Sequence, residues 1–96
     1  MIIARVTGTV VATAKEPRLS GLTMLLLQPT DPAGQPGKGA AVVAIDAVGA
    51  GLGDLVMYAA GSSARQTEVT KDKPVDAVVM GIIDLIEHQG EISYRK

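Results

Sequence analysis

A glycine-rich stretch, Gly49–Asp54 (GAGLGD), comes closest in this sequence to a loop that could bind a phosphate group. The dinucleotide-binding fingerprint places G-x-G-x-x-G between a strand and a helix. Here the third glycine comes one residue early, and a strand-like segment follows. A second candidate, Gly37–Gly39 (GKG), lacks the spacing and the Ser or Thr of a P-loop. We therefore expect both stretches to be turns, in which glycine allows a positive φ or a close approach of two backbones.

Serine catalysis is the second chemistry to consider, because Gly61–Arg65 (GSSAR) begins like a nucleophile elbow. The closing glycine of G-x-S-x-G is absent. A triad would also need His88, the single histidine, which we expect in a polar terminal turn. With no cysteine and one histidine, a thiolate nucleophile, a disulfide and a metal site of several Cys or His ligands within one subunit are all excluded. We expect no enzyme, no catalytic residue, no metal and no cofactor.

Two carboxylates stand inside apolar segments, Asp84 and Asp46. A buried carboxylate needs hydrogen-bond or charge partners. We expect Asp84 to be a buried structural carboxylate that accepts backbone N–H groups or pairs with Arg65, so that Asp84→Ala impairs folding or assembly. Asp46 raises the same question, and the alternative for both is a solvent-facing position at a rim.

Charge and aromatic content argue against a nucleic-acid partner. Nine basic and ten acidic residues give a net charge of −1, and the aromatic residues are Tyr58 and Tyr94 alone. A basic excess and stacking platforms are the usual signs of a nucleic-acid binder. No apolar run approaches the roughly 20 residues of a membrane helix, and polar residues interrupt Ile2–Ala14, so we expect no signal peptide, no membrane partner and a cytoplasmic protein.

The hydrophobic pattern predicts an all-β chain with a single domain over residues 1–96. The first segment alternates over Ile2–Ala14, with Gly8 placed where a long strand could bend. Pro29–Gly39 is predicted to be a mobile surface loop, and Gly61–Gln66 a short helical turn capped by Ser62. A helix is the rival interpretation of Val75–Glu87, but its β-branched residues and central Gly81 favour a strand. The other predicted strands are Leu22–Gln28, Ala40–Val48, Leu55–Ala60 and a short terminal strand at Glu91–Lys96.

Five or so strands with one short helical turn indicate a small closed barrel of the OB-like type. A barrel has one interior, so only one face of each strand can point into it. The second to fifth predicted strands are apolar on both faces, and no long helix is available to cover the outside. We therefore expect the chain to assemble with copies of itself. The alternative is that bulges exchange the two faces.

Several stretches, taken together and in order, resemble the EutN/CcmL family of vertex proteins from bacterial microcompartment shells. The resemblance covers nearly the whole chain. The stretches that carry it are Ile3–Thr13 (IARVTGTVVAT), Lys15 with Leu19–Gly21, Leu25–Pro29 (LLLQP), Ala44–Asp54 (AIDAVGAGLGD), Gly61–Arg65, Pro74–Ala77 (PVDA) and Ile82–Asp84 (IID).

The resemblance implies a cyclic homopentamer of OB-like barrels that closes the five-fold corners of a shell tiled by hexameric shell proteins. It also implies that two segments lie at subunit contacts or near the central axis; they comprise Gly49, Ala50, Gly51, Gly53 and Asp54, and Gly61, Ser62, Ser63, Ala64 and Arg65. Ring size does not follow from the residues themselves, because it depends on the interface angle. The alternative function is a small OB-like module that binds nucleic acid or a peptide ligand.

Overall fold

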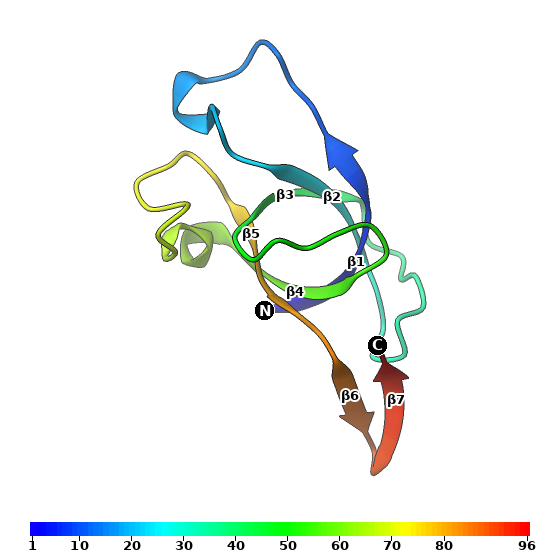
Figure 1. Ribbon diagram of the computed structural model, residues 1–96. Helices are drawn as coiled ribbons and strands as arrows, with labels where there is room; N and C mark the ends of the chain where they lie inside the picture. The colour runs from blue at the N-terminus through cyan, green and yellow to red at the C-terminus, as the bar shows by residue number, and fades with distance from the viewer.

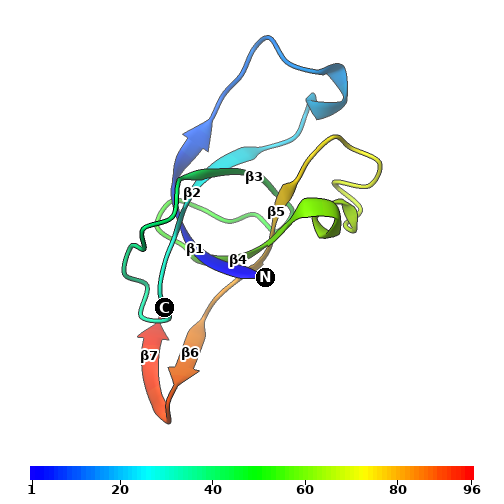
Figure 2. The same cartoon turned by 180° about the vertical axis from the view of Figure 1, so that it is seen from behind.

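Five strands close into a barrel, and two further strands form a hairpin that projects from it, as Figures 1 and 2 show from opposite sides. The computed structural model describes residues 1–96. The barrel order is β1-β2-β3-β5-β4, with β3 and β5 parallel and the other neighbours antiparallel. The elements are β1 (Ile2–Val10), η1 (Pro17–Leu19), β2 (Met24–Pro29), β3 (Val42–Asp46), β4 (Leu55–Ala60), η2 (Gly61–Arg65), β5 (Ala77–Ile82), β6 (Leu85–His88) and β7 (Glu91–Arg95). The predicted five-stranded all-β barrel is confirmed.

The first strand bends where Gly8 predicted a bend. The register between β1 and β2 shifts between Val6 and Gly8. Before this bulge, Ala4 and Arg5 pair with both β2 and β4, whereas Gly8–Val10 pair with β2 alone. The strand ends at Val10, four residues short of the predicted end, because β2 begins at Met24 opposite Val10 and leaves 11–14 without a partner. Residues 11–23 form an arm at one end of the molecule (Figure 1).

The predicted strand over Val75–Glu87 is two strands. β5 ends at Ile82, and the N–H of Ile83 makes a last bond to the carbonyl of Leu55. The chain then leaves the barrel, and β6 pairs with β7 across a turn at Gln89 and Gly90. Gly81 lies opposite Met57, at a register shift between β4 and β5. The apolar pattern runs through both strands, so it did not reveal that the chain stops pairing with the barrel strands after β5 and that β6 pairs with β7 instead.

The barrel interior is lined by one face of each strand. Its nine buried residues are Ala4, Val6, Leu25, Leu27, Ala44, Val56, Tyr58, Ala77 and Val79. A second cluster of five buried residues lies on the outer side of the wall, where η2 and the segment after it cover β3, β4 and β5; it comprises Ile45, Ala59, Ala64, Val75 and Val78. The chain therefore covers part of its own outer face, which the hydrophobic pattern does not reveal.

The structure has a second short helical turn, η1, besides the predicted η2, and it corrects the predicted N-cap of η2. The N-cap of η2 is Ala60 rather than Ser62, and it makes no side-chain cap bond. The expected mobile loop has its own bonds: Thr30 bridges to Pro36, and Asp31 Oδ1 accepts the N–H groups of Ala33 (2.9 Å) and Gln35 (3.0 Å).

Candidate functional site

The glycine-rich segment Gly49–Asp54 crosses one end of the barrel as a cap (Figure 1). Ala50 packs against the barrel core. Gly53 donates its N–H to the carbonyl of Val6, and the N–H of Val6 returns a bond to the carbonyl of Asp54, both at 2.9 Å. Gly49 has φ +78° and Gly53 has φ +87°, so the predicted need for positive φ is confirmed. The segment is a structural turn with no phosphate-binding helix behind it.

Two aspartates hold this cap from its two ends. Asp46 Oδ1 accepts the N–H groups of Val48 (3.0 Å), Gly49 (3.0 Å) and Ala50 (3.3 Å). Asp54 Oδ2 accepts the N–H of Gly51 at 2.8 Å. Of the two aspartates singled out in the sequence, Asp46 is therefore the one whose side chain accepts backbone N–H groups, and its position three residues before Gly49 was the available signal.

The expectation for Asp84 is wrong for the folded chain. Its side chain is exposed in the two-residue link between β5 and β6. Arg65 does not pair with it, because its Nη1 donates to the carbonyl of Val75 at 3.2 Å. An apolar sequence context suggested burial, but the link has already left the barrel at this point.

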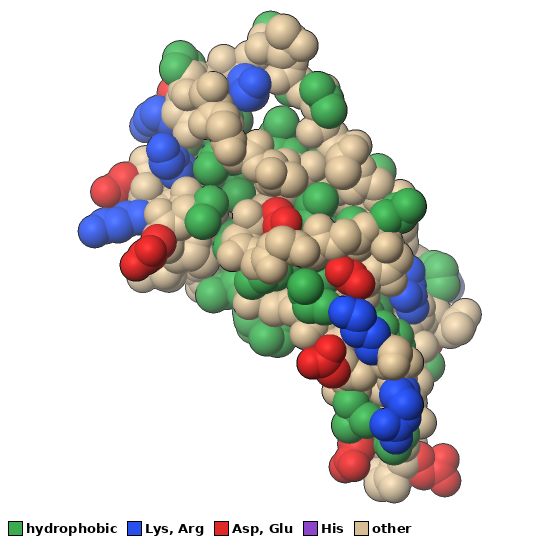
Figure 3. Space-filling model, in the orientation of Figure 1, with side chains coloured by type: hydrophobic (Ala, Val, Ile, Leu, Met, Phe, Trp, Pro, Cys, Tyr) green, Lys and Arg blue, Asp and Glu red, His purple; other side chains and the backbone are tan.

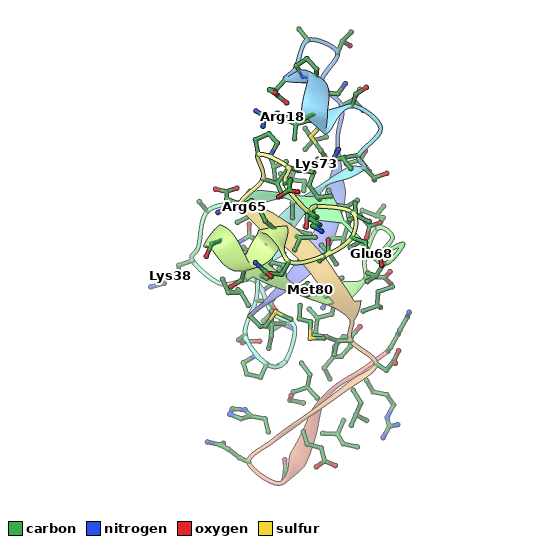
Figure 4. All side chains as sticks on the ribbon, turned by 90° about the vertical axis from the view of Figure 1, so that its left-hand side faces the viewer. Arg18, Lys38, Arg65, Glu68, Lys73 and Met80 are labelled. Atoms are coloured by element: carbon green, nitrogen blue, oxygen red, sulfur yellow. The ribbon has the colours of Figure 1, made fainter.

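The second predicted segment, Gly61–Arg65, is η2 and lies on the outer wall (Figure 4). Ala64 is fully buried against β4 and β5, whereas Ser62 and Ser63 are exposed. The two predicted segments flank the six residues of β4, and at about 3.3 Å per residue they stand roughly 20 Å apart. They are thus two separate places, one at each end of the same strand.

Thr70 fastens the segment that follows η2. Its hydroxyl is fully buried and donates to the carbonyl of Ala64 at 2.5 Å, and it also contacts the hydroxyl of Thr67 at 2.6 Å. We expect Thr70→Val to lower the free energy of unfolding by about 1–2 kcal/mol, because the isosteric side chain leaves a buried carbonyl without its donor. Urea denaturation measures this loss. Thr13→Val, at an exposed position of the arm, is the control and should change stability by less than about 0.5 kcal/mol.

No group of three His, Cys, Asp or Glu side chains could hold a metal ion. His88 lies on the projecting hairpin, far along the molecule from the serines of η2 (Figure 1). A hydrogen bond from the Arg18 side chain lowers the pKa of Glu16 at the start of η1. Charged side chains of both signs are interleaved on the face in Figure 3, and no helix is long and apolar enough to cross a bilayer.

What the structure does offer is two apolar patches on the outer wall that the chain leaves uncovered. The β4 patch consists of Ile3, Met57 and Met80 on the adjacent strands β1, β4 and β5; Met57 is 39% exposed and Met80 36%. Figure 4 shows Met80 on the wall below η2.

The β2–β3 patch consists of the paired residues Leu26 and Val43, of which Val43 is 47% exposed. It borders a groove of about 190 Å³ lined in part by Leu19, Met24 and Pro74. In the closed order β1-β2-β3-β5-β4, strand β4 stands across the barrel from β2 and β3. The two patches therefore face opposite directions.

Comparison with known proteins places this barrel in a family. Residues 1–84 match the family model described as ethanolamine utilisation protein EutN/carboxysome. The carboxysome shell vertex protein CcmL of Gloeobacter violaceus is 49% identical over 96 residues, covering 100% of this chain and 95% of that protein. The bacterial microcompartment shell vertex protein EutN of Escherichia coli is 40% identical over the full length of both.

Solved structures agree with the sequence relatives. The structure of Gloeobacter violaceus CcmL superposes with a TM-score of 0.93 at 49% identity, covering 100% of this chain and 98% of that one. The GrpN pentameric microcompartment shell protein from Rhodospirillum rubrum superposes with a TM-score of 0.82 at 40% identity, covering 92% of this chain and 99% of that one. With a family match over residues 1–84 and full-length relatives at 40–49% identity, this chain belongs to the EutN/CcmL family.

Proposed function

We propose that this chain is a single-domain structural shell protein that assembles as a homopentamer and closes a vertex of a bacterial microcompartment. The observation that carries the proposal is the pair of apolar patches on opposite sides of one barrel, in a chain whose family relatives are shell vertex proteins. In this role the chain sits in the shell, contacts hexameric shell proteins around its rim and catalyses no reaction.

Two different patches are what a ring requires. In a cyclic assembly of more than two subunits, each contact joins one surface of a subunit to a different surface of the next. A single patch would instead give a two-fold dimer. The β4 patch and the β2–β3 patch supply the two surfaces, with Met57 and Met80 of one subunit against Leu26 and Val43 of its neighbour.

The two segments at the ends of β4 complete the proposed contact. Leu52, at the tip of the Gly49–Asp54 cap, is 78% exposed, and Ser62 and Ser63 of η2 are exposed as well. Because β4 carries the centre of one patch, these segments border the contact at its two ends. Small residues there would let neighbouring subunits approach closely. We place Gly49–Asp54 and Gly61–Arg65 at subunit contacts or near the axis on this basis.

Native mass spectrometry at low micromolar concentration tests the assembly. We expect one dominant species of five chains. A monomer would contradict the proposed function, and salt-dependent binding of that monomer to single-stranded DNA would favour the alternative of a nucleic-acid-binding module.

The contact with hexamers needs a second experiment. The purified protein is mixed with a hexameric shell protein of the same microcompartment type, and the products are imaged by electron microscopy. We expect closed polyhedra with the chain present and open sheets or tubes without it, because a flat array of hexamers cannot close. Identical products in both mixtures would contradict the vertex role.

A further inference from the structure

Arg5 joins three parts of the chain that are far apart in sequence. Its Nη1 donates to the carbonyl of Gly53 at 2.9 Å, and its Nη2 donates to the carbonyl of Gly34 at 3.0 Å. Its guanidinium carbon also lies 5.9 Å from the centre of the Tyr94 ring on β7, within the range of a cation–π contact. The planar fork of arginine is suited to hold two acceptors and an aromatic face at once.

The hairpin of β6 and β7, which carries Tyr94, has few other ties to the barrel. It is joined covalently through Ile83 and Asp84 alone. The remaining polar ties are the Ser93 hydroxyl to the carbonyl of Pro32 at 2.6 Å and a distant pair between Lys96 Nζ and Asp54 Oδ1 at 3.8 Å. Figures 1 and 2 show the C-terminus beside the loop that holds Gly34. A two-stranded hairpin is marginally stable on its own, so its orientation depends on these ties.

The hairpin has an inner and an outer face. Ile86 and Tyr94 are paired and half-buried, which places them on the inner face. Leu85 and Ile92 are 43% and 48% exposed. The family model ends at residue 84, before this hairpin, whereas the full-length relatives match the chain through it.

We propose that Arg5 is the positioning residue that fixes the direction in which the C-terminal hairpin leaves the barrel. It does so by clamping the Gly49–Asp54 cap, the loop at Gly34 and Tyr94 into one unit. The inference goes beyond the proposed function and does not depend on it, because every contact of the clamp lies within one chain. If the ring forms, the clamp also sets the angle at which Leu85 and Ile92 face outward from each subunit.

Gly34 offers a way to disturb the clamp without touching Arg5. It is buried, and a Cβ added there would lie 2.5 Å from Arg5 Nη2 and 3.5 Å from Tyr94 Cδ1. Gly34 has φ +82°, so an alanine would also be strained locally. Gly21 is a matched control, because it has φ +83° and a Cβ added there would meet nothing within 4 Å. The Gly34→Ala and Gly21→Ala variants thus share the backbone strain and differ in the clash.

Amide hydrogen exchange of residues 85–95 tests the clamp. We expect Arg5→Ala and Gly34→Ala to accelerate exchange there by about ten- to a hundredfold, with barrel amides unchanged, because the contact of Arg5 with Tyr94 is lost together with the hydrogen bond that fixes Arg5 against the loop at Gly34. Gly21→Ala should leave hairpin exchange at the wild-type rate. Exchange within about twofold of wild type in Arg5→Ala, or an equal effect of Gly21→Ala and Gly34→Ala, would overturn the proposal.

A second set of variants distinguishes an effect on the clamp from an effect on assembly. Each variant is also made together with Met57→Lys, which places a charge in the β4 patch, and its mass is measured in the same solution. The clamp predicts faster hairpin exchange in both backgrounds. An effect of Arg5→Ala confined to the assembled protein would overturn it. A monomeric wild-type protein contradicts the proposed function but leaves this comparison intact.

Discussion

Met57→Lys is expected to convert the pentamer into a folded monomer. Met57 is 39% exposed in the single chain, so a lysine there can extend its ammonium group into water and the barrel still forms. In the ring the same position is covered by the next subunit, where an unpaired buried charge costs about 3–5 kcal/mol per contact. Native mass spectrometry measures the loss of the five-chain species, and circular dichroism verifies that the fold remains.

Val69→Lys is the matched control for this change. Val69 has nearly the same exposure, 37%, but lies on the segment after η2, outside both patches. It should leave the pentamer intact. Pentamers in both variants would contradict the placement of the β4 patch in the contact.

Val43→Lys extends the test to the opposite side of the barrel. If the contact joins the β4 patch of one subunit to the β2–β3 patch of the next, Val43→Lys alone is also monomeric. A mixture of the two variants then retains one intact pair of surfaces and should form a heterodimer that grows no further. If the β4 patch instead packed on itself around a two-fold axis, Val43→Lys would leave assembly unchanged.

The strands that the sequence predicted best are those bounded by turn residues. β4 was predicted at Leu55–Ala60, because Gly53 and Asp54 precede it and Gly61 follows it. β1 was predicted too long, since alternation continues past Val10 although no neighbouring strand does. Periodicity reports which faces are apolar, and it does not report which strand provides the partner.

Features that depend on contacts between distant segments were out of reach of pattern analysis. Nothing in the polar stretch around Thr70 indicates that it folds back over the wall and binds the carbonyl of Ala64. Arg5 is, by its pattern, one more polar residue on an alternating strand, yet it meets Gly34 and Tyr94. The expectation of uncovered apolar faces was correct for the two patches. It was wrong for the part of the outer wall that η2 and the segment after it cover.

Asp46→Ala is expected to detach the cap from the barrel end. One carboxylate oxygen accepts three successive N–H groups, of Val48, Gly49 and Ala50, and alanine leaves all three without this acceptor. Hydrogen bonds to a charged group contribute about 1.5–3 kcal/mol, and the partial exposure of this site favours a total loss of about 2–3 kcal/mol. Urea denaturation in the Met57→Lys background measures this without a contribution from subunit dissociation.

Two comparisons make the Asp46 result specific. Asp46→Asn keeps an oxygen at the same place and loses only the charge, so it should recover about half of the lost stability. Asp84→Ala removes an exposed carboxylate and should change the free energy of unfolding by less than about 0.5 kcal/mol. The two aspartates have similar apolar sequence surroundings, but the structure predicts a large loss of stability for Asp46→Ala and almost none for Asp84→Ala. A larger loss for Asp84→Ala than for Asp46→Ala would mean that the buried structural carboxylate is Asp84 after all, and that the cap does not depend on Asp46.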